Sequence, residues 1–246
     1  MMKPSLTRGS QGTHPIPLTI SALSFLLVSC GGASLQEGVT PAQAHMFAHF
    51  DRAGEVHQAL VQGDLARARE AAEWIVTHQD LGGSPATPAE YQSAMERFAG
   101  QVSVSPDLQQ AANAAAHMGQ ACGDCHRAND VEPRFLVGTA PPGGSGPEAE
   151  MARHIWASER MWEGLVGPGE HAWRSGAEAL RSGWLDPQQV VSNPEDRPRI
   201  RELVGQVYDL GSKAQSTTDP EARAELYGAF LNTCNECHVL TAARIR

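Results

Sequence analysis

The chain carries one five-residue pattern twice, and no other feature constrains its fold as strongly. The two copies read Cys122-Gly-Asp-Cys125-His126 and Cys234-Asn-Glu-Cys237-His238. On a helix, cysteines three positions apart share one edge. At this spacing thiols bond the vinyl groups of a porphyrin while the adjacent imidazole binds its iron. The pattern predicts covalent attachment of haem through Cys122, Cys125, Cys234 and Cys237, with His126 and His238 as proximal iron ligands.

Paired cysteines at this spacing also occur in redox dithiols, disulfides and zinc sites. A thioredoxin-type dithiol belongs to a strand-helix setting, which the helical pattern of this chain does not offer. A four-cysteine zinc site would need the two distant pairs to meet. None of these alternatives accounts for a histidine after both pairs. We therefore expect two covalently bound haem c groups in each chain.

Length and composition are those of a globular protein. The 246 residues suit one or two domains, and a hydrophobic content of 41% is sufficient for packed cores. The formal net charge of -9, with acidic and basic residues interspersed, argues against nucleic acid as a partner. A mildly acidic surface instead favours a basic redox partner.

The first thirty residues are typical of a targeting segment. Basic residues precede the apolar run 16–28, which is too short and too interrupted for a membrane span. The run ends in Leu27-Val28-Ser29-Cys30, which resembles the bacterial lipobox, in which the cysteine is acylated and becomes the first residue of the mature chain. The alternative is an ordinary cleaved signal, cut after Ala42-Gln43-Ala44.

We therefore expect a lipoprotein signal peptide over residues 1–29, lipidation of Cys30 and a tether over residues 30–40. The five cysteines then divide into four for haem and one for lipid, so none is left for a disulfide. By resemblance to bacterial lipoproteins, the glycine at position 31 indicates the outer membrane. The chain is thus expected on the periplasmic side of the cell envelope, held by a lipid anchor.

From residue 41 onward, apolar residues recur with the period of a helix. Residues 41–131 are expected to form a first bundle that ends in the first Cys-x-x-Cys-His motif. The first of its four helices is expected to run from Pro41 to about Gly63, and the second to start after a cap at Asp64. The third is expected to start at Thr87-Pro88 and the fourth at Ser105-Pro106.

Residues 132–148 are rich in proline and glycine and are expected to form a linker. After it the same order of helices returns over residues 149–246. The first three of these helices are expected over 151–165, 172–180 and 198–211. A fourth helix, capped by Asp219, is expected to lead into the second motif.

The two halves form an internal repeat. Met46 and His49 correspond to Met151 and His154 at an offset of 105 residues, and the Cys-x-x-Cys-His motifs are offset by 112. The second copy has therefore gained seven residues, mostly between its inner helices. The prediction is an all-α fold of two tandem four-helix bundles, each with its motif in the last helix.

The repeated Met-x-x-His pattern offers two candidate distal ligands for each iron. Methionine and histidine three positions apart share one helix face, so either can bind. Methionine is a common core filler, whereas a histidine repeated at one internal position has no comparable packing role. We expect His49 opposite His126 and His154 opposite His238, with Met46 and Met151 as the alternatives.

Other histidines and the tryptophans are interpreted as structural. Three histidines without a counterpart in the other half are expected at the surface, namely His57, His78 and His171. His45 and His117 lie near site residues but are also classed as structural. Tryptophans at helical spacing are expected to pack in the core or against haem, namely Trp74, Trp156, Trp162, Trp173 and Trp184.

This layout resembles the cytochrome c prime-like four-helix bundles and their six-coordinate relatives. In that family the Cys-x-x-Cys-His motif lies in the last helix and the opposite axial position faces the first. The resemblance covers residues 41–246 and, beyond the motif, is one of layout. It implies two c-type haem domains, and it implies that the halves pair as an internal pseudo-dimer or that two chains pair as a homodimer.

Three functional hypotheses follow. The first is an electron carrier without enzymatic activity that passes single electrons between periplasmic or membrane redox proteins. The second, implied by five-coordinate members of the resembling family, is binding or sensing of nitric oxide or carbon monoxide at an open iron position. The third is peroxidase-like catalysis, which needs acid-base groups over an open haem. The coordination state of the iron separates them.

Overall fold

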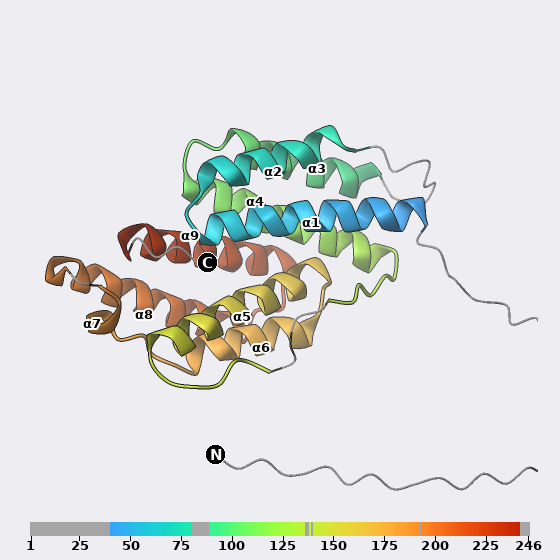
Figure 1. Ribbon diagram of the computed structural model, residues 1–246. Coiled ribbons are helices and arrows are strands. Elements are labelled where there is room, and N and C mark those ends of the chain that lie inside the picture. Colours follow the sequence, from blue (N-terminus) through green and yellow to red (C-terminus); the bar gives the residue numbers. More distant parts are fainter. Residues whose placement is uncertain (1–39, 80–88, 136–137, 139, 192, 242–246) are drawn as a thin grey trace, which may run out of the picture. The chain divides into compact units, whose positions relative to one another are not determined.

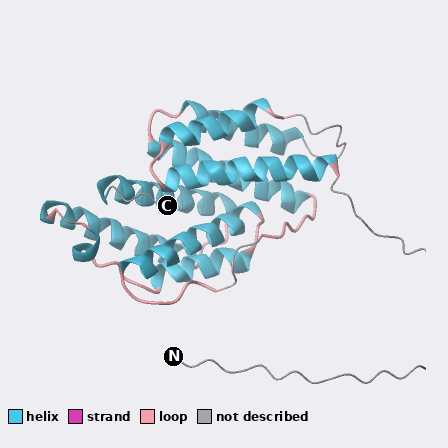
Figure 2. Ribbon diagram, in the orientation of Figure 1, coloured by secondary structure: helices cyan, strands magenta, loops and turns pink. Residues whose placement is uncertain are grey.

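A computed structural model describes residues 40–79, 89–135, 138, 140–191 and 193–241. Over these residues the chain is all-α and contains no strand, which confirms the predicted class (Figure 2). The expected signal peptide, Cys30 and the tether to residue 39 lie outside the described residues. The described part of the first half contains four helices: α1 (Pro41–Val61), α2 (Leu65–Thr77), α3 (Ala89–Val104) and α4 (Leu108–Ala128).

Four long helices also lie in the second half as far as the structure describes it, and their predicted positions are confirmed. They are α5 (Pro147–Val166), α6 (Glu170–Arg181), α8 (Arg197–Ala214) and α9 (Pro220–Thr241). Two short pieces, α7 (Pro187–Val190) and the 3-10 helix η1 (Pro194–Asp196), lie between α6 and α8. They fall in the stretch where the second copy was expected to gain residues.

Side-chain caps set several helix ends, and those at Asp64 and Asp219 were predicted. Thr40 and Gln43 form a reciprocal capping box at the start of α1. Gly63, with φ of 73°, takes the left-handed conformation in the short turn between α1 and α2. Asp64 follows it and caps α2, because its carboxylate accepts from the amide of Arg67 at 3.0 Å. Asp219 caps α9 in the same way, accepting from the amide of Ala222 at 2.9 Å.

The predicted start of α4 is wrong by two residues. Asp107, not Ser105, is its N-cap, with the carboxylate accepting from the amide of Gln110 at 2.8 Å. A carboxylate stabilises the exposed amides of a helix start more strongly than a hydroxyl does, because it also opposes the helix dipole. The Ser105 hydroxyl instead donates to the carbonyl of Gln101 at 2.7 Å and finishes α3. The predicted start of α3 at Thr87-Pro88 lies outside the described residues.

Contacts between helices fall into two rings of four. In the first set α1 contacts α2, α2 contacts α3, α3 contacts α4, and α4 contacts α1. In the second set α5 contacts α6, α6 contacts α8, α8 contacts α9, and α9 contacts α5. The sets meet chiefly through α4 against α9, and also through α1 against α9 and α4 against α5 (Figure 1).

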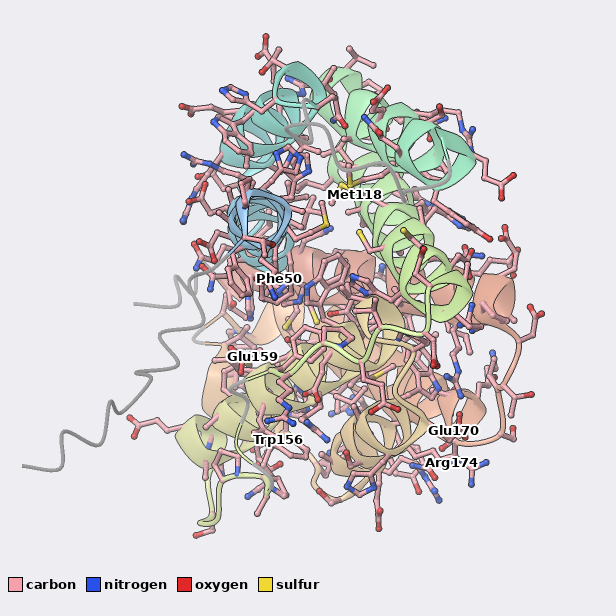
Figure 3. The ribbon with its side chains drawn as sticks, turned by 90° about the vertical axis from the view of Figure 1, so that its right-hand side faces the viewer. Phe50, Met118, Trp156, Glu159, Glu170 and Arg174 are labelled. Carbon is pink, nitrogen blue, oxygen red and sulfur yellow. The ribbon has the colours of Figure 1, made fainter. Side chains whose placement is uncertain are left out.

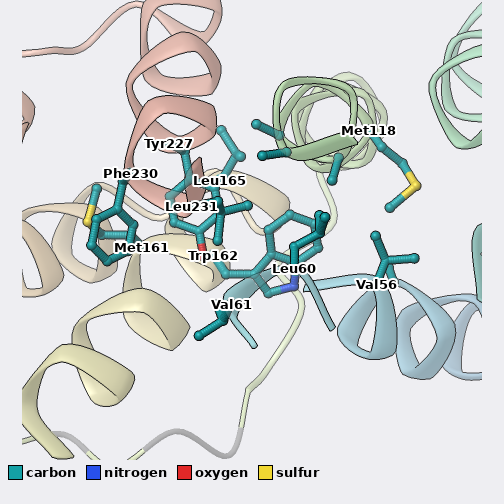
Figure 4. Packing of buried hydrophobic residues seen from close by; sticks show 14 of the residues in the cluster. Val56, Leu60, Val61, Met118, Met161, Trp162, Leu165, Tyr227, Phe230 and Leu231 are labelled. Carbon is teal, nitrogen blue, oxygen red and sulfur yellow. The ribbon is translucent and has the colours of Figure 1, made fainter. Parts of the chain in front are cut away.

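One hydrophobic core runs through both sets of helices. Residues 39–246 form one compact unit, and the main core cluster includes Leu60 from α1, Met118 from α4 and Leu231 from α9 (Figure 4). Burying a side chain of this size contributes about 1.5–3 kcal/mol. A smaller cluster lies at the end of the second set and consists of Leu185, Val191, Ile200, Leu203 and Val204.

Two glycines on α4 allow the close approach of the second set. A Cβ built on Gly119 would lie 2.5 Å from the Trp162 ring, and one built on Gly123 would lie 2.2 Å from the carbonyl oxygen of Leu165. Real Cβ atoms do not approach so closely, so α4 and α5 meet at this distance only because these positions lack side chains. The end of α5 is thereby held against the helix that carries Cys122.

Candidate functional site

The first pocket gathers predicted site residues from opposite ends of the first half. It has about 800 Å³ of empty space, which includes solvent at its open mouth. Figure 3 shows two of its lining side chains, Phe50 from α1 and Met118 from α4. The sequence-predicted residues that line it are Met46, His49, Cys122, Cys125 and His126.

The second pocket gathers the equivalent residues of the second half. It has about 490 Å³ of empty space and is therefore the smaller of the two. The predicted residues that line it are Met151, His154, Cys234, Cys237 and His238. Its remaining walls are mostly aliphatic and include Ile155, Leu185, Leu203, Val204 and Val207.

The histidine of each Cys-x-x-Cys-His motif is oriented by a backbone carbonyl. The Nδ1 of His126 donates to the carbonyl oxygen of Val166 at 2.8 Å, and the Nδ1 of His238 donates to that of Val61 at 2.6 Å. A carbonyl can only accept, so each Nδ1 carries the hydrogen and a neutral ring leaves Nε2 unprotonated. This is the tautomer that an iron-binding imidazole requires.

Each half supplies the carbonyl that accepts from the motif histidine of the other half. Val61 ends α1 and Val166 ends α5, and these residues are related by the same offset of 105 that relates His49 to His154. The histidine of each Cys-x-x-Cys-His motif is therefore hydrogen-bonded to the helix that carries the Met-x-x-His of the other pocket. Reciprocal contacts of this kind are those of an interface with two-fold symmetry.

Burial keeps the His238 imidazole of the second pocket neutral. His238 is 5% exposed, and burial lowers its pKa, an effect that the hydrogen bond to Val61 partly opposes. An imidazole with a lowered pKa is unprotonated at neutral pH, so its free nitrogen is available to a metal.

His49 presents a buried nitrogen without a partner. It is 5% exposed, and its Nε2 donates to the carbonyl oxygen of His78 at 2.7 Å. Burial lowers its pKa, so the ring is neutral and its Nδ1 is an acceptor. Among the residues that the structure describes, this Nδ1 has no hydrogen-bond partner. Such an atom is costly to bury and fits a position that binds a further group.

His154 occupies the corresponding position in the second pocket. Burial lowers its pKa to about 4, and Glu150 opposes this shift. Nearby Arg153 and His238 lower the pKa further, so the imidazoles of His154 and His238 lie close enough to interact electrostatically. The pocket thus holds one neutral imidazole on α5 and one on α9. Met151 lines the same pocket, whereas Met46 in the first pocket is 39% exposed.

The four cysteines are held as thiols. Burial raises the pKa of Cys122 to about 12 and raises that of Cys234 still further. The pKa values of Cys125 and Cys237 are also raised, again mainly by burial. A redox dithiol or a zinc thiolate requires a lowered pKa, so these environments favour neither. Over the described ranges no cluster of three or more His, Cys, Asp or Glu side chains is placed to hold a bare metal ion.

Sequence reasoning missed some residues of the first pocket. His45, classed as structural, lines it with its ring centroid 4.1 Å from that of His49. Met118, which is 1% exposed, also lines it. Helical spacing could have indicated both, since His45 precedes His49 by four residues and Met118 precedes Cys122 by four. Gln92, Tyr91 and Met95 come from α3 and had no such signal.

Two expectations about other aromatic residues are wrong. His57 was expected at the surface but is 5% exposed, because it packs against the second set and its Nε2 is hydrogen-bonded to the Tyr227 hydroxyl at 2.8 Å. Trp184 was expected to pack inside but is 54% exposed, because it lies beyond the end of α6. Trp156, Trp162 and Trp173 are buried as predicted.

Comparison with known proteins identifies no relative: no protein-family model, curated protein or solved structure matches the chain. None of the helices in the described ranges is long and apolar enough to cross a membrane.

Proposed function

We propose that the chain is a dihaem c-type cytochrome that carries single electrons between periplasmic or membrane redox partners. In this proposal two tandem four-helix bundles each hold one covalently bound haem c, and the two bundles pack as an internal pseudo-dimer. The observation that carries the proposal is the pair of proximal hydrogen bonds. His126 and His238 each donate Nδ1 to a carbonyl, and each lines a pocket that also contains two cysteines and a Met-x-x-His.

Each residue has a defined part in the proposed sites. A bound haem supplies the one-electron iron couple. The thiols of Cys122 and Cys125 in one pocket, and of Cys234 and Cys237 in the other, hold the porphyrin. His126 and His238 present Nε2 to the iron from α4 and α9. The apolar walls exclude water, which strengthens these contacts and tunes the reduction potential.

The distal ligands proposed are His49 and His154. His49 is supported by its buried Nδ1, which has no partner in the described part of the chain. His154 is supported by its lowered pKa and its interaction with His238. Two neutral imidazoles on one iron give a six-coordinate centre of low reduction potential compared with a methionine-histidine pair. Met46 and Met151 line the same pockets and stay as the alternatives.

A gas-binding function is the second candidate, and one difference between the pockets favours it at the first site. That pocket is the larger, and the Nε2 of His49 is already engaged by the carbonyl of His78. If His49 keeps that bond and its Nδ1 does not bind the iron, the position opposite His126 stays open for nitric oxide or carbon monoxide. Peroxidase-like activity needs the same open position.

The proposed location is the periplasmic face of the outer membrane, with the chain anchored by a lipid on Cys30. This rests on the sequence alone. A lipid anchor would keep an electron carrier close to membrane partners without a membrane-spanning helix.

A redox titration followed by absorbance and resonance Raman spectroscopy tests the function. Two reversible one-electron couples with low-spin, six-coordinate spectra are expected. A high-spin, five-coordinate signal from one haem, together with carbon monoxide binding, would favour gas binding at that site. The absence of any reversible couple would refute the electron-carrier proposal.

A further inference from the structure

Three aromatic rings stack in the core where the two sets of helices meet. The ring centroids of His57 on α1 and Trp162 on α5 are 5.5 Å apart, with an angle of 14° between the planes. Tyr227 on α9 stacks on both, with centroids 6.1 Å from His57 and 5.9 Å from Trp162. None of the three is more than 5% exposed. They form a compact unit built from both halves of the chain.

The stack lies midway between the two pockets. On α1, Ala53 lines the first pocket and Val61 lines the second, and His57 is four residues from each. On α5, Ser158 lines the second pocket and Val166 the first. Trp162 is again four residues from each. Eight residues of helix span about 12 Å, so each pocket wall is about 6 Å along the helix from the stack.

The same rings contact both cysteine-bearing helices. A Cβ on Gly119, three residues before Cys122 on α4, would lie 2.5 Å from the Trp162 ring. Tyr227 lies on α9 itself, two helical turns before Cys234. Its hydroxyl donates to the carbonyl of Ser158 at 2.7 Å and accepts from Nε2 of His57 at 2.8 Å. The stack is therefore joined to both attachment helices by direct packing.

Trp162 contributes its ring and not its polar group. Its Nε1 is buried and has no hydrogen-bond partner among the described residues. Trp173 on α6 differs in this respect. Its ring centroid lies 6.5 Å from that of Tyr227, and its Nε1 donates to the carbonyl of Ala214 at 2.9 Å. A buried donor without a partner is unfavourable, so the indole at position 162 has a cost that aliphatic packing would avoid.

We propose that His57, Trp162 and Tyr227 form the route by which an electron passes between the two haem sites. The proposal rests on the proposed function, because it requires a haem in each pocket. Electron tunnelling decays more slowly through densely packed atoms than across gaps, and the stack fills the space between the pockets. One electron leaves ferrous iron at one site and reduces ferric iron at the other. The three rings end unchanged, and no proton moves.

The test measures electron exchange between the sites in a half-reduced sample of the full chain. Two-dimensional exchange NMR of the haem methyl resonances, extrapolated to zero protein concentration, gives the first-order rate within one molecule. Trp162→Leu removes the central ring and Trp162→Phe keeps a ring at that place. Trp173→Phe is the matched control, because it alters a buried tryptophan and breaks a hydrogen bond but lies on α6, away from both pockets.

Trp162→Leu should slow the exchange about tenfold, which corresponds to a rise of about 1.4 kcal/mol in the activation free energy. Trp162→Phe and Trp173→Phe should exchange at close to the rate of the unmodified chain. The two midpoint potentials and the haem spectra should be the same in all variants. A general loosening of the core would instead change the potentials and the spectra. His57→Leu, which leaves the Tyr227 bond to Ser158 in place, should also slow the exchange and serves if Trp162→Leu does not fold.

An unchanged rate in Trp162→Leu and His57→Leu would refute the route, as would equal slowing by Trp173→Phe. In either case two reversible couples in the unmodified chain would leave the proposed function standing. Loss of those couples would instead refute the function itself, so the two failures are distinguishable.

Discussion

Alanine at position 123 should separate α4 from the end of α5. Gly123 directly follows Cys122, and a Cβ there would lie 2.2 Å from the carbonyl oxygen of Leu165. The position of a Cβ is fixed by its own backbone, and the Leu165 oxygen is a backbone atom. No side-chain rotation can therefore relieve the contact, and one helix must move. Overpacking of this kind costs about 1–3 kcal/mol. The next carbonyl, that of Val166, is the acceptor for His126, so the same movement should disturb the proximal imidazole.

Gly205→Ala is the matched control, because a Cβ at this position of α8 would meet nothing within 4 Å. Alanine is favoured over glycine inside a helix by about 1 kcal/mol, so the control should be slightly stabilised. Gly123→Ala gains the same helix preference, so the two variants should differ by the overpacking cost of about 1–3 kcal/mol in the free energy of unfolding. Urea unfolding at neutral pH measures this difference, and in the proposed haem-bound protein resonance Raman spectra would report the iron-histidine bond. Equal stability of the two variants would refute the close approach of α4 and α5.

Three further predictions concern single side chains. Burial lowers the pKa of His57 from 6.5 to about 4. As the pH falls below 6.5, the imidazole is therefore protonated in the unfolded chain before it is protonated in the folded chain. The free energy of unfolding thus decreases from pH 6.5 towards pH 4. Between pH 7 and pH 4.5 urea unfolding should register a loss of about 2.5 kcal/mol from this group, and His57→Leu should not show it. Near-infrared magnetic circular dichroism should lose one bis-histidine signal in His49→Ala and the other in His154→Ala, whereas unchanged spectra would point to the methionines. The chain should fractionate with membranes and become soluble as Cys30→Ala, and an intact mass that places the mature start elsewhere would contradict lipidation.

Sequence patterns predict those features that one local segment determines. Asp64 and Asp219 were recognisable as caps because a cap bonds to an amide within three residues. The gathering of His49 with Cys122 was expected from the resemblance to bundles whose first helix faces the motif, and the internal repeat singled out His49 on that helix. At Ser105 the local signal misled, because Asp107, two residues further on, is the stronger acceptor and caps the helix.

Features that depend on distant segments could not be read in this way. The burial of His57 depends on Tyr227, which is 170 residues away in the sequence. The carbonyls of Val61 and Val166 carry no sequence signal, since every residue has one. Their exchange between the halves became visible only once the two sets of helices were packed together.

The covalent haem content of the full chain tests the central claim most directly. After denaturation and extraction with acidified acetone, the chain should retain two haems per molecule. Replacing both Cys122 and Cys125 by alanine should leave one, and replacing both Cys234 and Cys237 should leave the other. A chain that releases its haem on extraction, or a double variant that retains the full complement, would contradict the account.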